Sequence, residues 1–274
     1  MPHQVFKWLI TGCSSGFGRA IAEAALDAGQ QVIATARDVR SIADLERGGS
    51  CEVMALDITD ADNIREVISA AGALDVIVNN AGYGLIGAVE ECSDEQIRRS
   101  LETNFFGPLN VIRAALPMLR AQKSGHVVNI SAAAAISNYP GFGIYGGAKA
   151  ALEMMSESLR LELAPLGIHV TLVQPGPFRT DFIARGLEKA AGEITDYAGS
   201  ARKFATFLET MNGKQPGDPV RAAEAIVKMV LDGETALRLP LGKYVLKKMR
   251  DKTAALTREM EKWETVAANA DFQN

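Results

Sequence analysis

The stretch Thr11-Gly12-Cys13-Ser14-Ser15-Gly16-Phe17-Gly18 lies between an apolar run, Val5–Ile10, and a segment of helical periodicity that begins at Arg19. Its three glycines let the backbone turn tightly and approach a bound phosphate closely. The helix that follows presents free N–H groups and the positive end of its dipole to an anion. The glycines are spaced by four and then two residues, unlike the commoner fingerprint of dinucleotide-binding proteins. We interpret this stretch as a dinucleotide-binding loop, the alternative being a glycine turn without a ligand.

The same alternation of apolar runs and helical segments continues along the chain. Strands are expected at Val5–Ile10, Gln31–Ala36, Glu52–Ala55, Leu74–Asn79, His126–Ile130, His169–Val173 and Leu237–Leu239. Helices are expected at Arg19–Ala28, Asp60–Ala71, Ser93–Gln122, Ile144–Ala164 and Pro219–Leu231. Strands that alternate with helices predict an α/β fold of the Rossmann type, doubly wound, with a mostly parallel seven-stranded sheet and helices on both faces.

No repeat and no flexible linker divides the chain, so residues 1–274 are expected to form one domain. Residues 177–216 mix aromatic side chains with charges and glycines, and we interpret them as a substrate-binding lid. The tail, residues 243–274, has helical periodicity and charges of both signs, which is typical of a solvated helix. Alternatively, the tail covers the mouth of the substrate site or meets another subunit.

Composition excludes several functional classes. Hydrophobic residues make up 47% and charged residues 23% of the chain, which is ordinary for a globular protein. A net charge of −4 argues against nucleic acid or an anionic membrane as a partner. No apolar run is long enough to span a membrane, and no signal peptide is apparent. Three scattered cysteines suit the cytoplasm and provide no metal-binding pattern, so no metal is expected.

The end of the second strand indicates which dinucleotide binds. NAD-binding proteins usually carry an acid there to hold the ribose 2′-hydroxyl. This chain instead has Ala36 followed by Arg37, whose guanidinium suits a 2′-phosphate, and Ser14 would add a hydroxyl. We therefore expect NADP(H), with NAD(H) as the alternative cofactor, unless Arg37 is simply a solvated surface residue.

Tyr145 and Lys149 lie four residues apart in a helical segment and therefore share one face. A tyrosine of ordinary pKa is a poor acid–base group at neutral pH. A neighbouring ammonium group is expected to lower that pKa, so that a proton can pass to or from an alkoxide. Taken alone, such a pair is more often an exposed feature of a helix surface.

Several motifs in order resemble the short-chain dehydrogenase/reductase family over roughly residues 5–240. They are Thr11–Gly18, Asn79-Asn80-Ala81-Gly82, Asn104, Tyr145-x-x-x-Lys149 and Pro175-Gly176-x-x-x-Thr180. The glycine spacing is similar to that of the branch with short chains. The stretches 32–38 and 178–181 resemble NADP-using bacterial members akin to hydroxysteroid and retinol dehydrogenases.

The resemblance implies roles for individual residues. Tyr145 would be the general acid in carbonyl reduction, Lys149 would hold the nicotinamide ribose, and Asn104 would hold a water of a proton relay. Alternatively, Asn79 only ties strands together, Asp57 caps the following helix and Asn104 disturbs a helix locally. The implied cofactor-binding residues are Gly12, Ser14, Ser15, Gly16, Phe17, Gly18, Arg37, Asp57, Ile58, Asn80, Ala81, Gly82, Tyr145, Lys149, Pro175, Gly176, Phe178 and Thr180.

One position departs from the family pattern. The family usually places a serine thirteen residues before the tyrosine, where this chain has Ala132. Ser131 is a candidate substitute and is included with the catalytic residues, but neighbouring strand residues point to opposite faces, so a bulge would be needed. Ser137 or another loop donor is a second candidate. The third explanation is that the hydroxyl is absent, whether by natural drift or by deliberate substitution, and that catalysis is impaired.

The expected function is an NADP(H)-dependent oxidoreductase that interconverts an alcohol with a ketone or aldehyde. Apolar residues in the lid and neighbouring loops favour a hydrophobic substrate; they are Tyr83, Ile86, Tyr139, Phe142, Phe178, Phe182 and Phe204. The alternative is a dinucleotide-binding sensor or scaffold that has lost turnover. The resemblance also implies a homodimer or homotetramer that pairs through residues 104–122 and 144–164.

Overall fold

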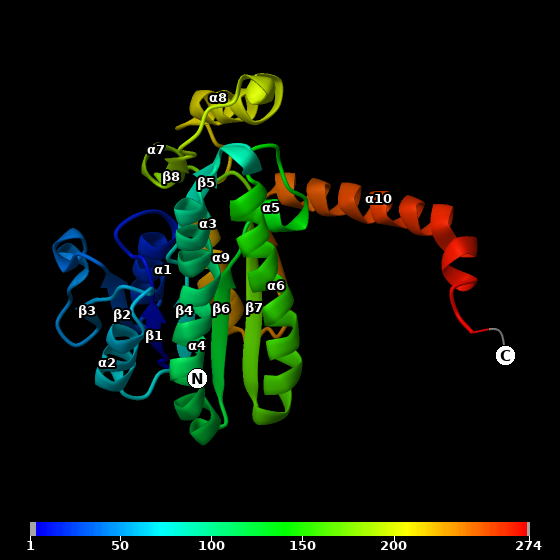
Figure 1. The fold of residues 1–274 in the computed structure, drawn as a ribbon. Coiled ribbons are helices and arrows are strands. Elements are labelled where there is room, and N and C mark those ends of the chain that lie inside the picture. Colours follow the sequence, from blue (N-terminus) through cyan, green and yellow to red (C-terminus); the bar gives the residue numbers. More distant parts are fainter. Residues whose placement is uncertain (1–3, 273–274) are drawn as a thin grey trace.

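The structure is a computed structural model that describes residues 4–272. Its centre is a sheet of seven parallel strands in the order β3-β2-β1-β4-β6-β7-β9 (Figure 1). The strands are β1 (Lys7–Ile10), β2 (Gln31–Ala36), β3 (Cys51–Ala55), β4 (Val76–Asn79), β6 (Gly125–Ile130), β7 (Ile168–Pro175) and β9 (Arg238–Leu241). All seven correspond to predicted strands, so the predicted α/β sheet is confirmed.

Helices cover both faces of the sheet and bury its alternating side chains. On one face, Ile10 of β1 packs in a cluster with Ile21 and Ile226, which belong to α1 (Gly16–Asp27) and α9 (Pro219–Leu231). The adjacent Leu9 points the other way and packs in the cluster of Ile112 and Leu159. This second face is covered by α2 (Ala61–Ala71), α4 (Gly107–Gln122) and α6 (Gly143–Leu163). Burial on both sides explains why the strands are almost wholly apolar.

The helix expected at Ser93–Gln122 is interrupted. It begins as α3 (Asp94–Leu101), where Ser93 and Gln96 form a capping box. A π-helical turn at Glu102–Phe106 follows, and α4 continues the helix. Such turns insert one extra residue and occur often at functional sites. Asn104 lies within this turn and is fully buried.

A smaller layer lies above the carboxyl ends of the central strands (Figure 1). Its strands, β5 (Gly84–Ile86) and β8 (Leu187–Lys189), form a two-stranded parallel sheet. Around them lie α5 (Ala133–Ile136), α7 (Phe182–Arg185) and α8 (Lys203–Met211). Shorter turns occur at Val39–Ser41, Ala43–Leu45, Val89–Glu91, Ala164–Leu166, Thr195–Tyr197 and Ala198–Arg202.

The last helix, α10 (Lys243–Ala268), projects away from the body of the molecule (Figure 1). Neither this helix nor any other within residues 4–272 is long and apolar enough to cross a membrane.

The order of the strands indicates where a ligand binds. From β1 the chain builds outward through β2 and β3, and then returns to add β4 on the other side of β1. In such sheets, ligands bind at the carboxyl ends of the strands where the direction of winding reverses. The glycine-rich loop after β1 and the segment Asn79–Gly82 after β4 meet at this point.

Candidate active site

The glycine-rich loop has the backbone shape that its sequence predicts. Gly12 and Gly16 have positive φ angles of 75° and 60°, which side-chain-bearing residues rarely adopt. A Cβ atom on Gly18 would lie 2.3 Å from the carbonyl oxygen of Gly12, so only glycine fits there. The helix α1 begins at Gly16, and Ser15 makes no side-chain capping bond among the described residues. The N–H groups of its first turn therefore remain available to an anion.

Thr11 fastens this loop to the segment after β4. Its Oγ1 accepts hydrogen bonds from the backbone N–H groups of Asn80 and Ala81, both at 3.0 Å. The Asn80 side chain donates in return to the carbonyl oxygens of Thr11 at 2.8 Å and Gly12 at 3.1 Å. The side chain of Asn80 thus holds the loop in shape. Asn79 bonds to Asn129 across the sheet at 2.8 Å, as one interpretation of the sequence expected.

At the end of β2, Ala36 is buried and Arg37 is exposed. No ion pair within residues 4–272 involves Arg37, so its guanidinium stays available for a phosphate. Asp57 accepts hydrogen bonds from the backbone N–H and the hydroxyl of Thr59, at 2.9 and 2.7 Å. It does not cap α2; Asp60 does so. Ile58 is buried and packs against Gly107.

The segment after β7 lies over the glycine-rich loop. A Cβ on Gly16 would lie 3.5 Å from the Cβ of Thr180, in ordinary van der Waals contact. Phe178 packs edge-to-face on Phe17, with 5.1 Å between the ring centroids. Gly176, after Pro175, donates its N–H to the carbonyl of Leu241 in β9 at 3.1 Å. The structure therefore brings Thr180 and Phe178 to the loop, as the motif order predicts.

Tyr145 and Lys149 lie on one face of α6 and are both buried. The Lys149 Nζ donates to the carbonyl oxygen of Ile130, at the end of β6, over 2.9 Å. Burial lowers the pKa of Lys149 from 10.5 to about 8. It also raises the pKa of Tyr145, because the tyrosinate would lose its hydration. The expectation that Lys149 lowers the pKa of Tyr145 is therefore wrong for the protein alone: burial dominates and keeps the phenol protonated.

Asn104 completes this cluster from the π-helical turn. Its Nδ2 donates to the carbonyl oxygens of Tyr83 and Ser100 at 2.9 and 3.0 Å. Its Oδ1 is buried and has no hydrogen-bond partner among the described residues. A Cβ on Gly82 would lie 2.6 Å from this oxygen and 3.5 Å from the Lys149 Nζ. The Oδ1 of Asn104, an acceptor without a partner among the described residues, and the Nζ of Lys149 thus both lie beside Gly82.

Ser131 and Ala132 point in different directions. The Ser131 hydroxyl donates to the carboxylate of Glu153 over 2.5 Å, inside the protein on the α6 side of the sheet. Gln174 donates to the same carboxylate at 2.9 Å. The expectation that Ser131 replaces the missing donor is therefore wrong, because its hydroxyl is used by Glu153. Ala132 instead packs in the cluster around Tyr145, so no hydroxyl comes from this position.

The surroundings of Tyr145 are aromatic. Its ring centroid lies 5.2 Å from that of Phe142 and 5.8 Å from that of Phe182. Phe204 of α8 stacks on Tyr139 at 5.0 Å. Of the predicted wall residues, Ile86 also joins this cluster, whereas Phe178 packs on Phe17 instead. The cluster forms an apolar wall beside the buried phenol.

The first turns of α10 extend this wall, which agrees with the alternative that the tail covers the mouth of the substrate site. The Tyr244 and Tyr139 hydroxyls share a hydrogen bond of 2.8 Å. The Lys248 Nζ lies 3.4 Å from the centroid of the Tyr139 ring, a cation–π contact. Burial lowers the pKa of Lys248 to about 8. These contacts could not be predicted from sequence spacing, because Tyr139 and Tyr244 are 105 residues apart.

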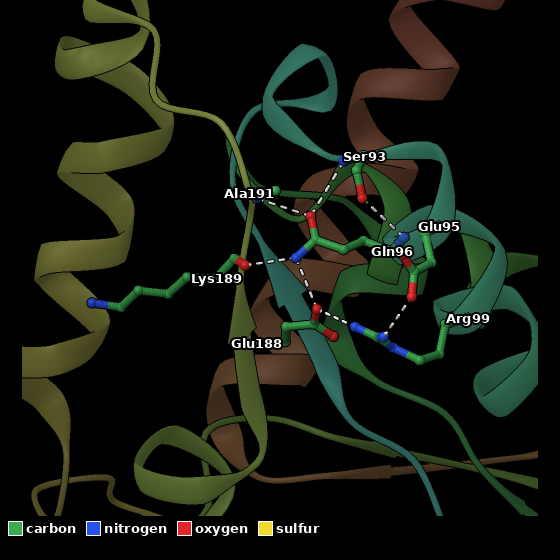
Figure 2. Close-up of polar contacts among 7 residues, drawn as sticks. All are labelled: Ser93, Glu95, Gln96, Arg99, Glu188, Lys189 and Ala191. Atoms are coloured by element: carbon green, nitrogen blue, oxygen red, sulfur yellow. Dashed lines mark hydrogen bonds and ion pairs between the residues drawn. The ribbon is translucent and has the colours of Figure 1, made fainter.

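Polar contacts anchor residues 188–191 to α3 (Figure 2). Gln96 donates to the Glu188 carboxylate and to the Lys189 carbonyl, both at 2.8 Å, and accepts from the Ala191 N–H at 2.9 Å. Arg99 pairs with Glu188 as well. This network fixes β8 and the chain that follows it above the site. Within residues 4–272 no group of three or more His, Cys, Asp or Glu side chains could hold a metal ion.

Comparisons with known proteins agree with this geometry. Residues 7–190 match the family model of the short chain dehydrogenases. The oxidoreductase claN of Passalora fulva is 46% identical over 197 residues, which cover 69% of this chain and 89% of that protein. The solved structure of a short-chain dehydrogenase from Streptomyces avermitilis is 40% identical in sequence and has a TM-score of 0.91. The alignment covers 99% of this chain and 100% of that chain.

A second solved structure contains a cofactor. The short-chain dehydrogenase of Burkholderia cenocepacia J2315, in complex with NADP, is 25% identical, with coverage of 96% of this chain and 98% of that chain and a TM-score of 0.76. The family match, the sequence identities and the shared fold confirm the resemblance seen in the motifs. The protein is therefore a member of the short-chain dehydrogenase/reductase family of oxidoreductases.

Proposed function

We propose that the protein is an NADP(H)-dependent oxidoreductase that interconverts a hydrophobic ketone or aldehyde with its alcohol. One observation carries the proposal. Tyr145 and Lys149 are buried together on α6, beside the free acceptor of Asn104, at the end of the sheet where the glycine-rich loop lies. The three scattered cysteines favour the cytoplasm as its location.

The residues at the loop fit a dinucleotide. Gly12 and Gly18 allow backbone to approach a pyrophosphate, and the start of α1 offers its N–H groups. Arg37 would bind the 2′-phosphate, which favours NADP(H) over NAD(H). A relative of the same fold is solved with NADP, which supports a dinucleotide at this site, and the preference for NADP(H) rests on Arg37. Lys149 would hold the nicotinamide ribose and Thr180 the carboxamide.

The dinucleotide, when bound, supplies or accepts the hydride. The protein's own part is the proton. In reduction, Tyr145 donates its phenolic proton to the substrate oxygen, and its raised pKa keeps that proton in place at neutral pH. Lys149 and the Oδ1 of Asn104 face the same position, where a relay would return a proton to the tyrosine. The aromatic wall of Phe142, Phe182 and Phe204 excludes water and favours a hydrophobic substrate.

Ala132 predicts slow turnover. A donor to the substrate oxygen is worth about 10²–10³ in rate in comparable sites. Ser131 does not replace it, because its hydroxyl is held by Glu153. This observation favours a second candidate function, a dinucleotide-binding protein without turnover. The retention of Tyr145, Lys149 and Asn104 argues for the enzyme.

The test follows NADPH absorbance with a panel of ketones and aldehydes, for the natural protein and for Ala132→Ser. We expect slow oxidation by the natural protein and a gain of about 10²–10³ in kcat for the variant. Ala135→Ser, outside the Tyr145 cluster, is the control and should change nothing. If neither protein turns over any carbonyl while both bind NADPH tightly, the second candidate is correct.

A further inference from the structure

The projecting part of α10 carries large apolar side chains that nothing in the described chain covers. Val245, at its start, is fully buried against the body. From Arg250 to Phe272 every residue is exposed except Ala255, which is half-buried. Leu256, Met260 and Trp263 are exposed by 49%, 67% and 54%. A solvated helix usually has a polar surface all round, so these side chains indicate a missing partner.

Most of the exposed apolar side chains of α10 follow a heptad repeat, with Val266 as the exception. They are separated alternately by three and four residues, the spacing of the contact seam in a two-helix coiled coil. The seam consists of Leu246, Met249, Thr253, Leu256, Met260, Trp263 and Ala267, and Thr253 is its one polar member. It starts on the first turns of α10, where Met249 is half-buried against the body, and continues outward without interruption.

The distribution of charge along α10 favours a second, antiparallel copy of this helix as the partner. The first ten residues, 243–252, carry five basic side chains and one acidic side chain. Residues 264–272, at the far end of the described chain, carry two acidic side chains, Glu264 and Asp271, and no basic one. A second copy of this helix in antiparallel orientation places the basic segment against the acidic one, whereas a parallel copy places like charges together.

Side-chain size selects the register. With Leu256 facing Met260 of a second copy, Trp263 faces Thr253, so that the largest seam residue meets a small one. The outer layer then pairs Met249 with Ala267, again large with small. In this register Arg250 flanks Glu264 of the second copy. The helix of the second copy, which ends at Ala268, then ends beside Lys248 of α10.

We propose that two copies of this protein associate through an antiparallel coiled coil of their α10 helices. The contact is separate from α4 and α6, through which the family resemblance predicts pairing. It is also independent of the catalytic proposal, because it involves none of the residues around Tyr145.

The first experiment introduces charge into the seam. The variant Leu256→Glu/Met260→Glu adds two carboxylates to the seam, and the control Ala254→Glu/Thr265→Glu adds two on the other faces of α10. All four positions are exposed, so folding should be unaffected. Sedimentation equilibrium should show that the seam variant assembles to half the mass of the natural protein, while the control retains the full mass.

The second experiment tests orientation and register. Arg250 and Glu264 lie about 21 Å apart in one helix and cannot meet within it. Arg250→Glu or Glu264→Arg alone should weaken association about fivefold, since each copy loses an attractive contact and gains a repulsive one. The double variant Arg250→Glu/Glu264→Arg should restore it, because the exchanged charges again face each other.

Three results would overturn the proposal. One is a seam variant with the same assembled mass as the natural protein. Another is a double charge variant no tighter than either single variant. The third is a natural protein that stays monomeric at all concentrations yet sediments with phosphatidylserine vesicles in a seam-dependent way, because the seam would then serve a membrane surface.

Discussion

The buried amine of Lys149 makes a quantitative prediction about stability. Replacing it with methionine, which has a similar length and no charge, should stabilise the protein without cofactor while removing activity. Burial lowers the pKa of Lys149 from 10.5 to about 8. At about 1.4 kcal/mol per pKa unit, keeping this group charged in the folded state costs about 3 kcal/mol. The hydrogen bond to the Ile130 carbonyl would be lost, at about 1 kcal/mol. The net gain at neutral pH is about 2 kcal/mol.

The pH dependence has a definite sign. Because the pKa of Lys149 is lower in the folded state, the unfolded chain binds more protons between pH 8 and 10.5. The stability of the natural protein should therefore rise through this window relative to the variant. Below pH 8 both states carry the proton and the full cost remains. Above 10.5 neither does, and the cost is gone.

Urea unfolding of Lys149→Met and the natural protein, at neutral and alkaline pH, measures this difference. The control is Lys203→Met, because Lys203 is exposed at the start of α8 and should change stability by less than about 0.5 kcal/mol. A Lys149→Met variant that is less stable than the natural protein at neutral pH would refute the reasoning. So would a stability difference that does not shrink with rising pH.

Three further predictions concern single residues. Gly18→Ala should abolish NADPH binding in a fluorescence titration, since the new Cβ would lie 2.3 Å from the Gly12 carbonyl oxygen. The control is Gly147→Ala, which adds a Cβ in open space on α6 and should bind NADPH normally. Equal binding by both variants would contradict the assignment of the glycine-rich loop. Arg37→Ala should weaken NADPH binding by about tenfold or more and leave NADH binding unchanged; equal losses for both would mean that Arg37 does not read the 2′-phosphate. Ser131→Ala should lower the free energy of unfolding by about 1–3 kcal/mol, because Glu153 loses one of its two donors, and leave the KM for the carbonyl unchanged. A raised KM in an equally stable protein would place the hydroxyl in the site.

Much of the fold was predictable because it depends on local patterns. Strands buried on both faces need continuous apolar runs, and β4, Val76–Asn79, is such a run with every residue buried. The pairing of β5 with β8 was not predictable. Each strand has three residues, and about a hundred residues separate Gly84 from Leu187. A local disturbance of the helix at Asn104 was one alternative, but its π-helical form was not predictable, since helical periodicity continues on both sides of it.

The site was predictable where spacing along one element decides the geometry. Tyr145 and Lys149 share a face because they are four residues apart in a helix. Alternation along a strand likewise correctly separated Ser131 from Ala132. The partner of Ser131 could not be found in this way, because Glu153 comes from another element. The direction of the pKa shift of Tyr145 was mispredicted, since burial depends on the aromatic side chains of distant segments such as Phe182.

The central claim is that Tyr145 moves a proton while the bound dinucleotide exchanges a hydride. The most direct measurement uses NADPH deuterated at the nicotinamide C4 with a ketone that the Ala132→Ser variant reduces. Mass spectrometry of the alcohol should find deuterium on the former carbonyl carbon. Adding Tyr145→Phe should remove product formation while NADPH binding, measured by fluorescence, stays unchanged. Deuterium absent from that carbon, or undiminished turnover without the Tyr145 hydroxyl, would contradict the account.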